Sequence, residues 1–182
     1  MLPTGHIAAG YLTAYAAIKI LKPDLDQHQV NQLLMMGAFW GFAPDIDEFW
    51  FFFKNKSLLV NPVGVKKYHH DYFTHAPVVW LVAGLAVYLV SSSDYTKFFG
   101  LVLWLASWSH FLLDSIEYGI MWLWPLSNKL YALKGGGEKP FVIEEKNFFK
   151  HSLKFVYLYA TTSISFYLEV LIIIASLIVF FK

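Results

Sequence analysis

Five long apolar runs, separated by polar segments, dominate the sequence. They cover residues 7–21, 30–43, 76–90, 97–113 and 163–181. A helix needs about 20 apolar residues to cross the hydrocarbon core of a bilayer. The pattern therefore predicts an all-α, polytopic transmembrane helical bundle of about five spans. The last run, 163–181, is the clearest span, and 30–43 reaches the necessary length only if the aromatic block at 49–53 extends it.

The segments at and between the apolar runs contain the residues that begin and separate the predicted helices. Pro77 opens the third run at a position suited to the first helical turn. Residues 116–126 are too short to cross and would lie at the interface or line a site, whereas 134–140 are predicted to form a flexible linker. A basic, aromatic, amphipathic stretch follows. We expect 1–182 to form a single integral membrane domain, with Met1 in the mature protein.

Composition supports a membrane protein and restricts its chemistry. Hydrophobic residues make up 57% of the chain, charged residues 15%, and the mean hydropathy is +0.48. The net charge of +1 argues against nucleic acid as a partner. There is no cysteine and no arginine. A metal ion could therefore be held only by histidine, carboxylate or backbone oxygen.

One short stretch concentrates such ligands. Residues 69–75 read His-His-Asp-Tyr-Phe-Thr-His and directly precede an apolar run. Imidazole nitrogen and carboxylate oxygen bind zinc and similar divalent ions. The stretch predicts one wall of a metal site, in which His70 and His75 would suffice as ligands and His69 is the weakest candidate.

Threading the runs as alternating crossings brings the other candidates to the same side. The first run starts there, the second returns there, and the fourth ends there. Ionisable residues near the ends of spans are costly unless they pair or bind a metal. The predicted ligands that converge on this side are His6, Asp45, Asp47, His70, His75, His110 and Asp114.

Helical spacing refines this set. His110 and Asp114 are at i and i+4 and share a face, which Glu117 continues three residues later. His6 lies on a stripe with Gly10, and small residues in such a stripe let membrane helices pack closely, which directs His6 toward protein.

Two acids follow Pro44, and each could have one of two roles at a metal site. Asp45 and Asp47 can converge in a turn, where one would ligate and the other orient a histidine. Asp47 and Glu117 are the candidate catalytic bases. Among the remaining ionisable residues, His28 and His151 have polar neighbours and are predicted to be solvated, and Glu169 is a buried acid that needs a partner.

These motifs together resemble a known family. His6 with Gly10, Pro44-Asp45-Ile46-Asp47, His70 through Thr74-His75, and Ser109-His110-x-x-x-Asp114 with Gly119 and Trp124-Pro125 are similar to the YdjM-like inner-membrane metal-dependent hydrolases. The resemblance covers about residues 6–126. That family looks distantly similar to the zinc-dependent phospholipase C and P1 nuclease group, which are all-helical enzymes.

The resemblance implies metal-activated water attacking a phosphoester, with one to three zinc-like ions. The chain departs from the family pattern at Asp71, where an arginine usually follows the histidine, so Lys66 or Lys67 would have to face a phosphate. A lipid or lipid-linked phosphoester is the expected substrate class.

Two further points stay open at this stage. The alternative to a hydrolase is a metal-binding membrane protein without catalysis, either a transporter or a structural scaffold. Most lysines fall in segments on the side of the site, which favours the cytoplasmic face. The sequence does not indicate an oligomeric state.

Overall fold

The regular structure of the chain is helical. The computed structural model describes residues 1–55, 69–135 and 143–182. Its helices are α1 (Pro3–Leu21), α2 (Gln27–Phe42), α3 (Ile46–Asn55), α4 (Pro77–Val90), α5 (Asp94–Asp114), α6 (Phe148–Thr162) and α7 (Ile164–Phe180). The predicted all-helical class is confirmed for these residues. Lys66, Lys67 and most of the predicted linker lie outside them.

Three short 3₁₀ turns interrupt the helices where the candidate ligands occur. They are η1 (Ala43–Asp45), η2 (His69–Asp71) and η3 (Phe73–His75). Pro44 lies in the first of these turns, so α2 ends where its ring and missing N–H stop an α-helix from continuing. The acids after Pro44 are thereby placed at a helix end.

Local signals set several other helix boundaries. Pro77 occupies the first turn of α4, as predicted. Asp26 and Gln29 form a capping box at the start of α2: the Asp26 carboxylate accepts from Gln29 N at 2.8 Å, and Gln29 Oε1 accepts from Asp26 N at 3.1 Å.

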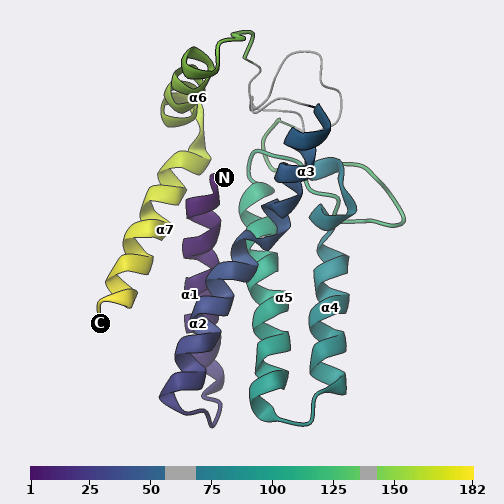
Figure 1. Ribbon diagram of the computed structural model, residues 1–182, viewed down its shortest axis with the longest axis vertical. Coiled ribbons are helices and arrows are strands. Elements are labelled where there is room, and N and C mark those ends of the chain that lie inside the picture. The colour runs from purple at the N-terminus through teal and green to yellow at the C-terminus, as the bar shows by residue number, and fades with distance from the viewer. Residues whose placement is uncertain (56–68, 136–142) are drawn as a thin grey trace.

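The helices form a bundle whose centre is the pair α1 and α5. Helix α1 packs against α2, α5 and α7, and α5 packs also against α2 and α4. Figure 1 shows α1, α2, α4 and α5 side by side, with α7 outside α1 and with α3 and α6 at the end where α1 begins.

Glycines let α1 and α2 approach closely, as the small-residue stripe on α1 predicted. A Cβ added at Gly10 would lie 2.2 Å from the Gly37 carbonyl oxygen and 2.8 Å from Gly41 Cα. Only a hydrogen fits there. Because α1 crosses α2 at this contact, His6, one turn earlier, faces the interior.

The apolar core lies toward the opposite end of the bundle from the 3₁₀ turns. Ala14, Ala17, Leu33, Phe98 and Val102 form it, contributed by α1, α2 and α5. The other end of these helices holds buried ionisable side chains instead. The bundle is thus divided along its length into an apolar half and a polar half.

Fewer described helices than predicted have the length and hydropathy of a membrane span. Helix α5 has 21 residues and is long and apolar enough to cross a membrane, and α6 with α7 passes only as a pair bent by 86°. Among the described residues no other helix is both long enough and apolar enough to cross a membrane, so about five spans are not confirmed. Helix α4 has only 14 residues, and α2 has 16 and begins with polar side chains.

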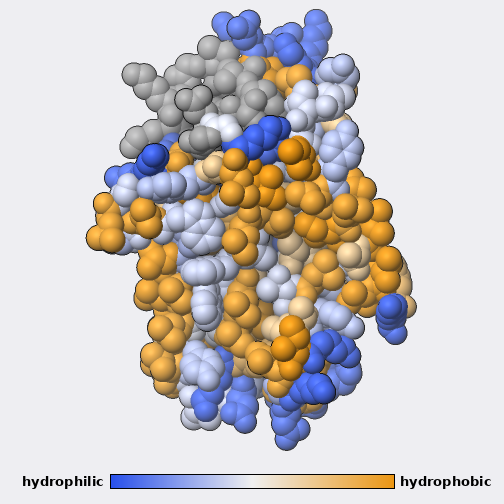
Figure 2. All heavy atoms as spheres, turned by 180° about the vertical axis from the view of Figure 1, so that it is seen from behind, coloured by the Kyte–Doolittle hydropathy of each residue, from blue (hydrophilic) through white to orange (hydrophobic). Residues whose placement is uncertain are grey.

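The surface nevertheless has a membrane-like distribution of side chains. Figure 2 shows hydrophobic side chains over the middle of one face and hydrophilic side chains gathered at its two ends. Exposed apolar residues on α7 include Leu171 and Ile174. Such a band is what a bilayer would cover.

The glycine contact gives a test of the packing. Gly10→Ala should destabilise the fold by about 1–3 kcal/mol, because the methyl group forces α1 and α2 apart. Thermal unfolding of the purified protein in detergent would measure this. Ala16→Leu, a larger addition at an exposed position of the same helix, should change stability by less than about 0.5 kcal/mol. Equal effects of the two variants would contradict the close crossing.

Candidate metal centre

The candidate ligands come from the ends of several elements that meet at one end of the bundle. His6 is in the first turns of α1, and His110 and Asp114 are in the last turns of α5. Asp45 ends η1, while η2 and η3 supply His70 and His75. Each of these side chains is buried. The structure therefore brings together residues as far apart as 6 and 114.

Asp114 is the meeting point for three imidazoles. Its Oδ1 lies 3.2 Å from His6 Nε2, and its Oδ2 lies 3.3 Å from both His70 Nε2 and His110 Nε2. The His6 and His110 rings are stacked with centroids 3.7 Å apart. The Met1 ammonium is 2.5 Å from Asp114 Oδ1 and adds positive charge beside this carboxylate.

Asp45 gathers a second, overlapping set. Its Oδ1 lies 3.5 Å from His75 Nε2, 3.5 Å from His110 Nε2 and 3.8 Å from His69 Nε2. His110 faces both carboxylates, so the two sets share one imidazole. His69, the weakest sequence candidate, thus lies beside the cluster.

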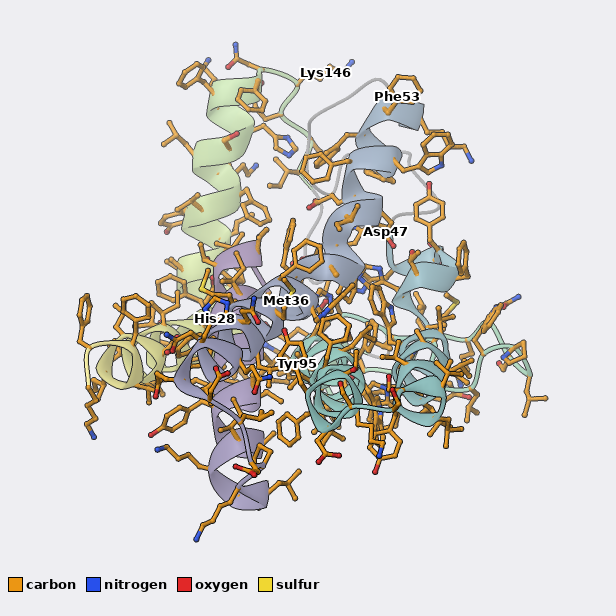
Figure 3. All side chains as sticks on the ribbon, turned by 60° about the horizontal axis from the view of Figure 1, so that its bottom comes forward. His28, Met36, Asp47, Phe53, Tyr95 and Lys146 are labelled. Atoms are coloured by element: carbon orange, nitrogen blue, oxygen red, sulfur yellow. The ribbon has the colours of Figure 1, made fainter. Side chains whose placement is uncertain are left out.

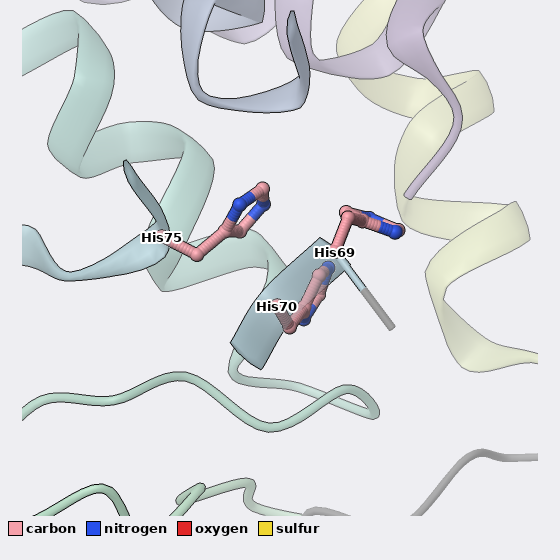
Figure 4. A group of neighbouring side chains, drawn as sticks. All are labelled: His69, His70 and His75. Atoms are coloured by element: carbon pink, nitrogen blue, oxygen red, sulfur yellow. The ribbon is translucent and has the colours of Figure 1, made fainter. Parts of the chain in front are cut away.

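Two groups have the compactness of a metal site. One ligand atom from each of Asp45, His75, His110 and Asp114 lies within 4.8 Å of the others, and the same holds for His69, His70 and His75. Figure 4 shows these last three rings close together, carried by two short turns of one loop. A buried His/Asp group of this kind could hold a metal ion.

The separations between the candidate ligand atoms are also those expected around one shared ion. Zinc binds imidazole nitrogen and carboxylate oxygen at about 2.0–2.2 Å, so two tetrahedral ligands stand roughly 3.4 Å apart. The Nε2 atoms of His75 and His110 are 3.4 Å apart. His6 has no hydrogen-bond partner for either ring nitrogen among the described residues, although both nitrogens are buried. These observations match an ion-sized centre among the ligands.

Backbone carbonyls fix the tautomers of two histidines. His70 Nδ1 lies 2.9 Å from the Gly119 carbonyl oxygen, and His110 Nδ1 lies 2.8 Å from that of Gly41. A carbonyl can only accept, so each Nδ1 carries the proton and donates it. In a neutral ring the Nε2 lone pair then points at a carboxylate, and the two repel each other unless a cation lies between them.

Asp47 has a different place from Asp45. Its Oδ2 accepts from His75 Nδ1 at 2.7 Å and from the Thr74 hydroxyl. A carboxylate that holds the outer nitrogen of a histidine leaves Nε2 directed at the metal position. This geometry separates the two acids that the sequence left undivided: Asp45 faces the cluster, and Asp47 orients His75.

The electrostatics of the loop histidines follow from burial and neighbouring charge. Burial lowers the pKa of His70 and lowers that of His69 well below its ordinary value. Burial acts in the same direction on His75, but its hydrogen bonds to Asp45 and Asp47 outweigh burial and raise its pKa to about 10. Burial thus favours the neutral form of His69 and His70, which is the form that binds a metal, whereas a metal ion bound by His75 would have to displace the proton on its Nε2.

Glu117 is built into the start of α7. Its Oε1 accepts from Lys134 Nζ at 2.9 Å and from Ile164 N at 3.2 Å, and its Oε2 accepts from Ser165 N at 3.1 Å and from the Ser163 hydroxyl. Both oxygens are engaged by groups outside the cluster. A carboxylate at a helix N-terminus is stabilised by the helix dipole.

Glu169 has the partner that the sequence did not identify. It reaches the start of α1, where Oε1 accepts from the Thr4 hydroxyl at 2.6 Å and Gly5 N at 3.1 Å. Its Oε2 accepts from Leu2 N at 3.2 Å and from the Tyr159 hydroxyl at 2.5 Å. The acid therefore caps α1, one turn from His6.

A cavity of about 410 Å³ adjoins the cluster. Asp45, His69 and His70 form its polar side. Four aromatic side chains, namely Phe52, Tyr118, Phe148 and Phe155, line it together with the first three residues of the chain. Glu48 also lines it, and burial, with the nearby charges of Asp45 and Asp47, raises the pKa of this acid to about 7.

The remaining histidines are outside the site. His28 is exposed at the start of α2, at the opposite end of that helix from Asp45. His151 is 1% exposed, and its Nδ1 lies 2.8 Å from the Glu145 carbonyl oxygen. The prediction that His151 is solvated was therefore wrong: it lies on the inner face of α6, where polar neighbours in sequence do not reveal burial.

Glu117 predicts a pH effect on stability. Burial raises its pKa, but the hydrogen bonds from Ser163, Lys134 and Ser165 outweigh burial and lower it to about 2. A depressed pKa contributes stability above the unfolded value of 4.5 and loses it as pH falls toward 2. The stability advantage of the wild type over Glu117→Gln should therefore shrink as unfolding is measured at falling pH. Glu144→Gln, at an exposed site, should show no such trend. An advantage constant with pH would contradict this account.

Comparison with known proteins identifies the family of the chain. No curated protein and no solved structure shows significant similarity to the chain. The family model described as YdjM inner membrane protein matches residues 1–182. The match includes the last third of the chain, beyond the motifs that end at Trp124-Pro125. The chain therefore belongs to the YdjM inner membrane protein family.

Proposed function

We propose that the chain is a membrane-embedded, metal-dependent hydrolase, with zinc as the expected metal. One observation carries the proposal. In the buried cluster, His70 and His110 donate from Nδ1 to backbone carbonyls, and the Nε2 atom of each faces Asp114 at 3.3 Å, a separation expected for two ligands of one ion. Buried charges are costly unless they are paired or coordinate a metal. A divalent cation would satisfy the lone pairs and both carboxylates at once.

The proposed ligands are the seven sequence candidates without Asp47. His75, His110, Asp45 and Asp114 form the central position, since their ligand atoms lie within 4.8 Å of one another. His6 and His70 would complete the surroundings of Asp114. One set of histidines faces Asp114 and another faces Asp45, so more than one ion could bind, within the expected one to three.

Asp47 is the better of the two candidate bases. A metal ion bound here would lower the pKa of its water to about 7 and polarise the bond to be cut. Asp47 Oδ2 holds His75, while its Oδ1 is buried and has no hydrogen-bond partner among the described residues, so it can accept a proton. Glu117 instead acts as a positioning residue, because its oxygens hold the start of α7.

The proposed substrate is a lipid or lipid-linked phosphoester. The cavity beside Asp45 combines ionisable side chains with aromatic and aliphatic ones, which suits an amphipathic molecule. Membership of an inner membrane family supports a substrate drawn from the bilayer. The similarity to zinc-dependent phospholipase C and P1 nuclease, and the cytoplasmic placement of the site, are parts of this proposal.

A non-catalytic metal scaffold is the second candidate. The cluster joins α1, α5, η1 and the loop of η2 and η3, so a bound ion would tie these elements together. Transport is less well supported. Its best sequence indicator was Glu169, which caps α1 at the site end of the bundle and does not continue a polar path along α7.

Metal content tests the centre itself. The purified protein should contain a stoichiometric divalent metal by elemental analysis, and His75→Ala or Asp114→Ala should remove most of it. Asp47→Asn should weaken metal affinity about 10–100-fold without abolishing it, because this residue orients a ligand. His28→Ala, at an exposed position outside the cluster, should retain full occupancy. Unchanged metal content in Asp114→Ala would contradict the centre.

Hydrolysis separates the enzyme from the scaffold. The metal-loaded protein in mixed micelles should release the phosphorylated head group of a phospholipid, and a chelator should abolish release until metal is restored. Asp47→Asn, tested at saturating metal, should lower kcat by about 10²–10⁴-fold, the contribution typical of a general base. A metal-loaded, folded protein that hydrolyses no phosphoester would favour the scaffold.

A further inference from the structure

Helix α6 has an unusual direction relative to its neighbour. It meets α7 at an angle of 86° across Ser163. Figure 3 shows α6 and α7 running in different directions, with Lys146 beyond the outer end of α6. Glu117 holds the bend in place by accepting from Ser163, Ile164 and Ser165. If α7 enters the bilayer, α6 lies in the plane of its surface.

One face of α6 belongs to the protein interior. Phe148, Ser152 and Phe155 line the cavity beside Asp45. His151 and Tyr159 are buried on the same side. These positions recur at the three- and four-residue spacing of a single helical face.

The outward face is apolar and has no protein partner among the described residues. Phe149, Leu153 and Val156 are 78%, 70% and 58% exposed, and they stand at i, i+4 and i+7. Lys150 and Lys154 are exposed on the adjacent stripe, one position after Phe149 and Leu153, and Lys146 precedes the helix. An apolar face bordered by lysines is the pattern of a helix that lies in a membrane interface.

We propose that α6 is an interfacial helix whose apolar face enters the bilayer surface and whose lysines bind anionic phospholipid head groups. Three features support lipid over a second copy of the chain. The apolar surface continues onto the exposed residues of α7, such as Tyr167 and Leu171. The bend aligns α6 with a membrane plane. Lysine is depleted in protein interfaces but favoured beside acidic lipids.

The placement of α6 has a consequence for the cavity. The helix that lies in the head-group layer is also a wall of the space beside Asp45, so the cavity stands at the depth of lipid head groups. That a lipid-linked substrate enters the cavity at this depth rests on the proposed hydrolase. The interfacial position of α6 does not, since its evidence lies in the outer face of the helix.

Labelling can test the interface directly, because the chain contains no cysteine. Phe149→Cys and Leu153→Cys would carry an environment-sensitive fluorophore, with Lys150→Cys and Lys154→Cys as matched neighbours. In vesicles of phosphatidylcholine and phosphatidylglycerol, lipids spin-labelled on the upper part of the acyl chain should quench positions 149 and 153 several-fold more than 150 and 154. Equal quenching at all four positions would overturn the proposal. Quenching that appears only between labelled copies would instead assign the face to a second chain.

Charge reversal tests the lipid preference. The triple change Lys146→Glu, Lys150→Glu and Lys154→Glu should reduce lipid quenching of a label at 149 in anionic vesicles and leave it unchanged in pure phosphatidylcholine. An unaltered label in anionic vesicles would overturn the role of the lysines. Metal content should be unaffected in both cases, since these three lysines are exposed whereas the cluster is buried, so failure of this inference is distinguishable from failure of the metal centre.

Discussion

Two buried carboxylates that face imidazole lone pairs determine much of this structure. Asp45 and Asp114 are 5% and 1% exposed, and around them lie Nε2 atoms at 3.2–3.8 Å. Because carbonyls accept from Nδ1 of His70 and His110, the Nε2 lone pair of each neutral ring would repel the facing carboxylate unless a cation lay between them. Buried charges at this end of the bundle would destabilise the fold by themselves. A bound cation would instead join the elements that carry them.

Two further acids support that junction from outside it. Glu169 accepts from the first residues of α1, and Glu117 accepts from the first residues of α7, so each carboxylate neutralises the positive end of a helix. Through these contacts the C-terminal helices fix the start of α1, which carries His6, and the segment after Asp114. The last third of the chain contributes no cluster ligand, yet it positions two of them.

The site and the membrane meet at α6. Its inner residues Phe148 and Phe155 line the cavity, while its outer face exposes Phe149 and Leu153 beside a stripe of lysines. Here the 86° bend at Ser163 lets one helix lie along the bilayer surface while the next enters it. A lipid-linked substrate and a buried metal centre are compatible with this arrangement.

The sequence by itself determined the helices, because apolar runs and prolines act locally, and it predicted which ionisable residues gather at one end, because alternating helices return their termini to the same side. Tertiary structure decided the rest. Asp45 and Asp47 are two residues apart and chemically alike, so only their orientation after Pro44 gives one to the cluster and the other to His75. The partner of Glu169, 164 residues away at Gly5, and the burial of His151 depend on packing between distant helices, which no local pattern encodes.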